Sequence, residues 1–162
     1  MRNSPTVRTG KHDANFATPD GRYAYFTCAD EIMKCDEAAF SGDAILLSGN
    51  GNFIARYYSG DFNAYQRTYV LIPKDSRYFG LVYFSVKRVS ESLAKRSAGS
   101  IVKFITKGDV EGISVPRYNE KAAIINQCLK EALIGSRQIS HLTRLRDFLL
   151  PMLMNGQVEI KE

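Results

Sequence analysis

Residues 49–71 read GNGNFIARYYSGDFNAYQRTYVL, and this stretch says most about the fold. Asn and Gly both tolerate a positive φ angle, so the opening GNGN is a strong turn signal. It separates the aliphatic run AILLS at 44–48 from the aromatic run FIARYY at 53–58. Two short β-rich runs joined by such a turn predict a β-hairpin.

Working outward, SGDFNA at 59–64 predicts another turn, and RTYVLI at 67–72 predicts a strand that Pro73 ends. RYAYFT at 22–27 predicts a further strand, and the mixed apolar and basic pattern at 77–98 predicts a helix.

Thr106 is positioned to cap a short helix through Glu111, and residues 113–115 predict a strand stopped by Pro116. The first 118 residues thus predict a compact α+β domain with a twisted mixed β-sheet and short helices. The remaining residues, 119–162, predict one long helix and a tail.

The long helix is indicated by spacing. No proline occurs between Asn119 and Pro151, and apolar or small residues alternate three and four apart, with Arg146 in the one missing place. A helix of roughly 30 residues would be about 45 Å long, more than an ordinary domain needs. Gly135 costs about 1 kcal/mol relative to alanine, which makes sense where another helix crosses closely. The alternative is a helix packed on its own domain. The seam residues are Ile125, Cys128, Ala132, Gly135, Ile139, Leu142 and Leu149.

The net charge of +5 is unevenly distributed. Residues 76–118 carry eight Lys and Arg against three Asp and Glu, whereas the segments on either side are close to neutral. Such an excess suggests a surface that faces a polyanion, and Asn side chains in the loops could bond base edges. The DNA-binding candidates are Lys11, His12, Asn15, Asn50, Asn52, Arg56, Lys87, Arg88, Lys95, Arg96, Lys103 and Lys107.

Enzymatic signatures are missing from the sequence. It contains no phosphate-binding glycine loop, no nucleophile elbow and no zinc-protease helix, and no partner group supports His12 as a general base. Cys28, Cys35 and Cys128 match no zinc spacing, so we expect free thiols, no metal and no cofactor. No run is long enough for a membrane span or apolar enough for a signal peptide, and we expect a cytoplasmic protein.

Five stretches together resemble the target recognition domain and spacer of type I restriction–modification specificity subunits. They are TGKHDAN at 9–15, RYAYFT at 22–27, the stretch at 49–71, AGSIVKFITKGDVEGISVP at 98–116 and LRDFLLPMLMNG at 145–156. They occur in the order of such a subunit and cover nearly the whole chain. FNAYQRTYVL at 62–71 is the most specific of them.

The resemblance implies a non-catalytic module that reads one half of a split DNA target and docks modification (methyltransferase) subunits and, in some assemblies, restriction subunits. It implies a recognition domain at 1–118 and a spacer helix at 119–162. A full specificity subunit has two recognition domains and two antiparallel helices. This chain has one of each and is expected to be a half subunit, a truncated gene product or an excised part. Pairing of two copies through the helix would supply both missing parts.

Two other functions stay open from the residues alone, a protein-interaction module acting through the helix and a small nucleic-acid-processing enzyme. Within FNAYQRTYVL, Tyr65, Tyr69, Val70 and Leu71 are interpreted as core packing around a strand. Arg67 is either a buried tether or a phosphate contact, and we favour the tether. The loops at 11–15 and 50–56 are the better candidates for contact with bases.

Overall fold

The hairpin predicted around residues 49–52 is the centre of the fold. In the computed structural model, which describes residues 5–97 and 104–156, β4 (Phe40–Ser48) pairs antiparallel with β5 (Ala55–Ala64). The chain reverses at Gly51, whose φ of 70° lies in the left-handed region that glycine adopts readily. The hairpin prediction is confirmed.

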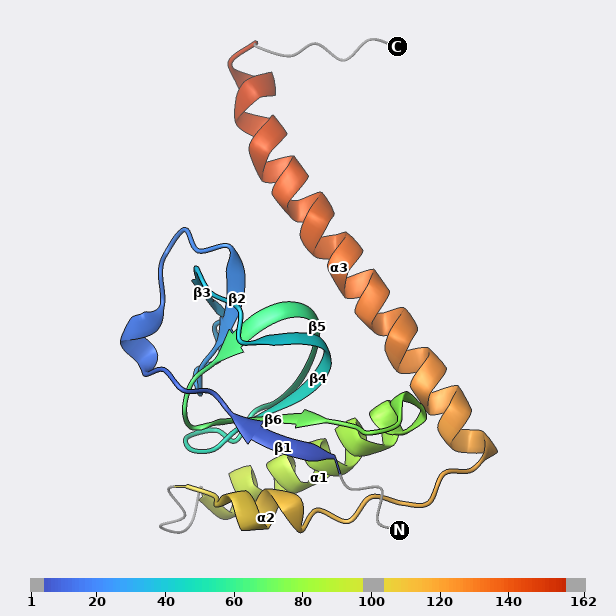
Figure 1. The fold of residues 1–162 in the computed structure, drawn as a ribbon. Coiled ribbons are helices and arrows are strands. Elements are labelled where there is room, and N and C mark those ends of the chain that lie inside the picture. Colours follow the sequence, from blue (N-terminus) through green and yellow to red (C-terminus); the bar gives the residue numbers. More distant parts are fainter. Residues whose placement is uncertain (1–4, 98–103, 157–162) are drawn as a thin grey trace. The chain divides into compact units, whose positions relative to one another are not determined.

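The turn predicted at 59–64 is wrong, because β5 continues through it to Ala64. Gly42 and Gly60 face each other across the ladder with φ angles of 96° and 135°. Glycine without a Cβ lets two paired strands bend here while their hydrogen bonds persist. Figure 1 shows the resulting curvature of β4 and β5. The same letters that favour a turn therefore bend a continuous hairpin.

Six strands form one sheet in the order β1-β6-β4-β5-β2-β3. The only parallel pair among these strands is β2 with β5, so the sheet is mixed, as predicted. The four strands outside the hairpin are β1 (Thr6–Thr9), β2 (Tyr23–Phe26), β3 (Met33–Cys35) and β6 (Thr68–Ile72).

Both faces of the central strands are buried, which explains the unbroken apolar run in β4. One face packs a cluster that includes Phe26, Leu46 and Phe62. Helix α1 (Phe79–Ser97), preceded by the short η2 (Ser76–Tyr78), packs against β5 and β4. Its buried residues recur at helical spacing, and the Tyr83 ring meets Tyr57 edge-on at 4.9 Å between centroids. The buried positions on α1 include Phe79, Val82, Tyr83, Ser85, Val86 and Ser90.

Two shorter helices precede and follow these elements, η1 (Ala14–Phe16) and α2 (Lys107–Glu111). The predicted cap of α2 is confirmed, because Thr106 and Asp109 form a reciprocal capping box. The carboxylate of Asp109 accepts hydrogen bonds from Thr106, and these hold its pKa below the ordinary value. The strand predicted at 113–115 is wrong. Those residues are an unpaired connection in which Ile113 and Val115 are half-buried without joining the sheet.

The long helix is confirmed as α3 (Glu120–Met154), whose 35 residues span roughly 52 Å. Asn119 accepts a hydrogen bond from the Ala122 amide at its start. The chain forms two compact units, Met1–Asn126 and Gln127–Glu162. Asn126 belongs to the first unit, where its side chain accepts from the Gly80 amide and donates to the Ser76 carbonyl. None of the described helices is long and apolar enough to cross a membrane.

Candidate nucleic-acid interface

Several loops meet at one end of the sheet and form a surface that we call the loop rim. Three backbone hydrogen bonds join them: Gly49 N–H to the Arg67 carbonyl at 2.8 Å, Gln66 N–H to the His12 carbonyl at 2.9 Å, and Ile105 N–H to the Gly49 carbonyl at 2.9 Å. The rim comprises residues 10–16, 27–31, 49–54, 65–67 and 104–106. The segment at 27–31 is attached by the Cys28 thiol, which donates to the Arg67 carbonyl, so segments far apart in the sequence are joined in one surface.

Two glycines allow this close approach of backbones. A Cβ on Gly10 would lie 1.5 Å from the carbonyl oxygen of Ala64, and one on Gly49 would lie 2.4 Å from that of Arg67. Neither contact is sterically possible, and both obstacles are backbone atoms that cannot move aside easily. These two glycines are therefore required by the crossing of the loops.

The first loop of the rim presents two of the predicted residues, Lys11 and Asn15, to solvent. Its backbone is held by Tyr25, whose hydroxyl donates to the Asp13 carbonyl at 2.5 Å. Burial, followed by the negative charge of Asp13, raises the pKa of Tyr25 to about 12. His12 stacks on Phe16 with the ring centroids 3.7 Å apart, so its ring packs within the loop.

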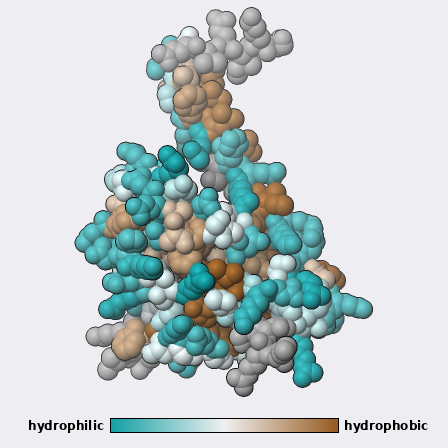
Figure 2. All heavy atoms as spheres, in the orientation of Figure 1, coloured by the Kyte–Doolittle hydropathy of each residue, from teal (hydrophilic) through white to brown (hydrophobic). Residues whose placement is uncertain are grey.

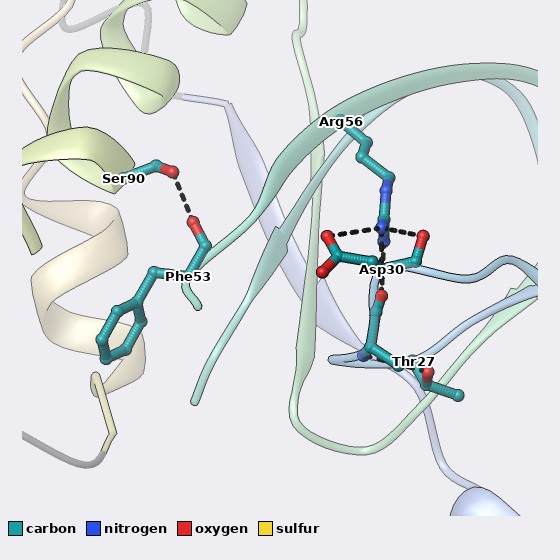
Figure 3. A network of polar contacts seen from close by, with 6 residues as sticks. Thr27, Asp30, Phe53, Arg56 and Ser90 are labelled. Atoms are coloured by element: carbon teal, nitrogen blue, oxygen red, sulfur yellow. Dashed lines mark hydrogen bonds and ion pairs between the residues drawn. The ribbon is translucent and has the colours of Figure 1, made fainter. Parts of the chain in front are cut away.

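The hairpin loop is anchored by Phe53, which is fully buried at a φ of 50°. The Ser90 hydroxyl of α1 donates to its carbonyl, and Figure 3 shows the two groups facing each other. Next to this anchor Asn52 is exposed. Asn50 has its Oδ1 buried with no donor among the described residues. Asn52 can therefore offer both ends of its amide to a base edge, whereas Asn50 in this conformation cannot.

Arg56, predicted as a loop residue in contact with bases, lies instead in β5 and holds another loop. Its guanidinium donates twice to the Ala29 carbonyl at 3.0 Å and once to the Asp30 carbonyl, and it lies 3.9 Å from the Asp30 carboxylate. Figure 3 shows this arrangement, in which only 18% of the Arg56 side chain is exposed. Most of its donors already have acceptors within the protein.

Arg67 is exposed, so its interpretation as a buried tether is wrong. The carbonyl of Arg67, and not its guanidinium, is held in place, by the Gly49 amide and by the Cys28 thiol at 3.6 Å. Its exposed neighbour Gln66 was not among the predicted residues, because the surrounding motif indicated core packing. The signal that could have found both is a pair of long polar side chains between two strands.

The basic residues of α1 form a separate group. All four are exposed, and Arg96 bonds back to Ser92 on its own helix. In α2, Lys107 lies 3.5 Å from Glu111. Lys103 is outside the described residues. The structure therefore brings the loop candidates together, whereas the α1 set lies on a helix outside the rim segments and comprises Lys87, Arg88, Lys95 and Arg96.

The rim also carries negative charge, since Asp30 is 81% exposed and Glu31 is exposed beside it. No group of three or more His, Cys, Asp or Glu side chains within the described ranges could hold a metal ion. The chemistry that the rim offers is hydrogen bonding and charge.

The predicted seam of α3 is largely open in the single chain. Ile139 is 68% and Leu142 61% exposed, and Figure 2 shows hydrophobic side chains exposed along this helix. A Cβ on Gly135 would meet no atom within 4 Å. Cys128 and Ala132 are exposed, and Ile125 and Leu149 are half-buried.

A mixed sheet with a loop-built polar rim, followed by a long helix with an open apolar seam, defines the class of the protein as α+β. Solved structures share this fold, two of them as follows. The specificity (S) subunit of a type I restriction–modification system from M. genitalium matches with a TM-score of 0.68 and 21% identity, over 91% of this chain and 42% of that one. The HsdS subunit from Thermoanaerobacter tengcongensis matches with a TM-score of 0.54 and 18% identity, over 96% of this chain and 44% of that one.

In sequence, the chain is 38% identical over 166 residues to the type I restriction enzyme EcoDI specificity subunit of Escherichia coli. The match covers 94% of this chain and 36% of that relative, so the chain spans about a third of the relative's length. No family model matches the chain. The resemblance noted in the sequence is confirmed: this chain is homologous to one region of the type I restriction specificity subunits.

Proposed function

We propose that this chain is a DNA-recognition module that reads one part of a split target for a type I restriction–modification system. In this proposal the loop rim contacts the DNA, and the chain performs no catalytic step itself. Modification subunits, and in some assemblies restriction subunits, dock on it and carry out the chemistry in the cytoplasm.

One observation carries the proposal above the others. The 38% identity to a specificity subunit extends over 94% of the chain and so includes both the sheet and the long helix. A match confined to the helix would have supported a protein-interaction module equally well. The exposed Lys11, Asn15, Asn52 and Arg67 give the rim the side chains that bond phosphates and base edges.

Selection from randomised duplexes with the purified full chain tests this function directly. We expect enrichment of a defined sequence and an affinity that falls steeply with salt. Methylome sequencing of cells that carry the chain with its modification subunit should then show methylation at the same sequence. A chain that binds no duplex above background would favour the protein-interaction module. Turnover of DNA by the pure chain, abolished by a point mutation in it, would favour the enzyme.

We also propose that two copies pair through α3. One heptad-bearing helix cannot bury its own seam, and one recognition domain cannot read a two-part target. An antiparallel two-fold pair supplies both missing parts. Gly135 lies near the middle of α3, where such a crossing brings the two backbones together and where a side chain would find only open space in the single chain. A symmetric pair should read a palindromic, gapped site.

Sedimentation at micromolar concentration tests the pairing. We expect Ile139→Glu with Leu142→Glu to dissociate the pair and to leave the recognition domain folded by circular dichroism. Ile134 is a matched control, because it is 54% exposed but lies off the seam, so Ile134→Glu should leave the pair intact. A wild-type chain that sediments as a monomer would contradict the pairing.

A further inference from the structure

The turn at residues 65–67 lies at the centre of the loop rim. Its backbone accepts from the Gly49 amide of the hairpin loop and from the Cys28 thiol, and it donates to the His12 carbonyl. The following amide, of Thr68, closes the turn on the Tyr65 carbonyl at 2.8 Å. Three loops therefore hold the one segment from which Arg67 projects.

A hollow of about 300 Å³ lies beside Arg67. Tyr69 and Ile105 help to line it and are held together, because the Tyr69 hydroxyl donates to the Ile105 carbonyl at 2.9 Å. Burial, with the charge of Asp109 as a smaller cause, raises the pKa of Tyr69, so the hydroxyl stays protonated as a donor. Phe104, also in its lining, is 64% exposed. An exposed aromatic residue and an arginine that line the same hollow offer apolar contact and positive charge together.

The charge of Arg67 is not neutralised within the protein. In the described part of the chain, no carboxylate lies within 4 Å of its guanidinium, whereas Arg56, another arginine bordering the rim, is bonded to two carbonyls and lies near Asp30. Because hydrogen bonds from the Gly49 amide and the Cys28 thiol hold the Arg67 carbonyl in place, less ordering is needed when its side chain meets a ligand. A pre-positioned, uncompensated guanidinium suits an anionic ligand oxygen.

We propose that Arg67 is an anchoring residue that binds one backbone phosphate of the DNA, with Phe104 packing against the adjacent deoxyribose. The inference rests on the proposed function and deepens it by assigning a role to this position. A phosphate contact at the hub of three loops sets the register of the flanking loops on the duplex without reading sequence itself. Lys11 and Asn15 on one side and Asn52 on the other are then placed to contact the groove.

The test compares Arg67→Gln with Arg77→Gln in the full chain. Arg77 is also an exposed arginine, lies beyond the far end of β6 and is paired with Asp75 at 2.7 Å, and both variants remove one positive charge. Binding to the selected duplex and to an unrelated duplex is measured by fluorescence anisotropy between about 50 and 200 mM salt. We expect Arg67→Gln to make the slope of log K against log[salt] less steep by about 0.9. The variant should bind both duplexes more weakly by the same factor and should select the same sequence as the wild type. Arg67→Lys should retain the slope, and Arg77→Gln should match the wild type.

Duplexes in which single phosphates are replaced by neutral methylphosphonates locate the contact. Among the replacements that weaken binding of the wild-type chain, one should have no further effect on the binding of Arg67→Gln. If Arg67→Gln changes the selected base at one position, Arg67 reads sequence and the inference is wrong. An unchanged slope with an intact thermal transition would also overturn it. In both cases the wild-type chain still binds its target, so the proposed function survives. If the wild-type chain binds no duplex, both the proposed function and the role of Arg67 are wrong.

Discussion

Replacing Arg56 tests whether this residue supports the rim or contacts DNA. Arg56→Met keeps the length of the side chain but removes the guanidinium. The change deletes the three hydrogen bonds to the Ala29 and Asp30 carbonyls and the 3.9 Å ion pair with the Asp30 carboxylate. The loop at 27–31 then loses its attachment to β5.

The expected magnitude follows from the exposure of the partners. Hydrogen bonds to a charged group contribute about 1.5–3 kcal/mol each when both partners are buried. Here Ala29 and Asp30 are exposed, so water replaces much of what the guanidinium supplied, and the ion pair adds little. We expect a loss of about 1–2 kcal/mol in the free energy of unfolding, or roughly 3–6 °C in Tm.

Urea unfolding and amide hydrogen exchange provide the assay. Arg88→Met is the matched control, because Arg88 is exposed on α1. Arg88→Met should leave the free energy of unfolding within about 0.5 kcal/mol of the wild-type value, as is usual for surface positions. In Arg56→Met, exchange at residues 27–31 should accelerate, while the salt dependence of DNA binding keeps its slope. Unchanged stability and exchange, together with a slope lower by about 0.9, would refute the tether and make Arg56 a phosphate contact.

Three further predictions concern the helix charge, the hairpin anchor and alkaline stability. Replacing the four α1 cations with glutamine should flatten the salt slope of DNA binding by about 0.9 for each DNA phosphate that they neutralise, and an unchanged slope would mean that this face points away from DNA. Phe53→Ala should cost about 3–5 kcal/mol in urea unfolding, because a fully buried ring is removed, and a cost below about 1 kcal/mol would show that the anchor is dispensable. Because Tyr25 has a pKa of about 12 when folded and the ordinary value of 10.0 when unfolded, only the unfolded state loses this proton as pH rises through that window. Stability should therefore fall between pH 10 and pH 12, and Tyr25→Phe should remove that part of the fall, whereas an identical pH profile for the variant would contradict the assigned pKa. The four α1 cations in the first of these predictions are Lys87, Arg88, Lys95 and Arg96.

The residues of the candidate site could be predicted in part. Lys11, Asn15 and Asn52 were expected in loops and are exposed there. The roles that the sequence predicts for Arg56 and Arg67 are reversed in the structure. Arg56, predicted to contact bases, holds a loop, and Arg67, favoured as a tether, faces solvent. Arginine chemistry suits both roles equally, so sequence alone cannot choose between them. The choice depends on which carbonyl or carboxylate lies within reach after folding.

Local order was largely determined by the sequence. The turn around Gly51, the helix from Phe79, the Thr106 cap and the start of α3 at Asn119 each follow from side chains acting on backbone within a few residues. What the tertiary structure decided is long-range. Only strand pairing shows that Gly42 meets Gly60, so that a predicted turn becomes a bend in a hairpin. Only the crossing of loops sets Gly49 against Arg67 and turns the motif at 62–71 into the hub of the rim. A residue's neighbours along the chain act through fixed covalent geometry, whereas its neighbours across the sheet depend on how the whole core packs.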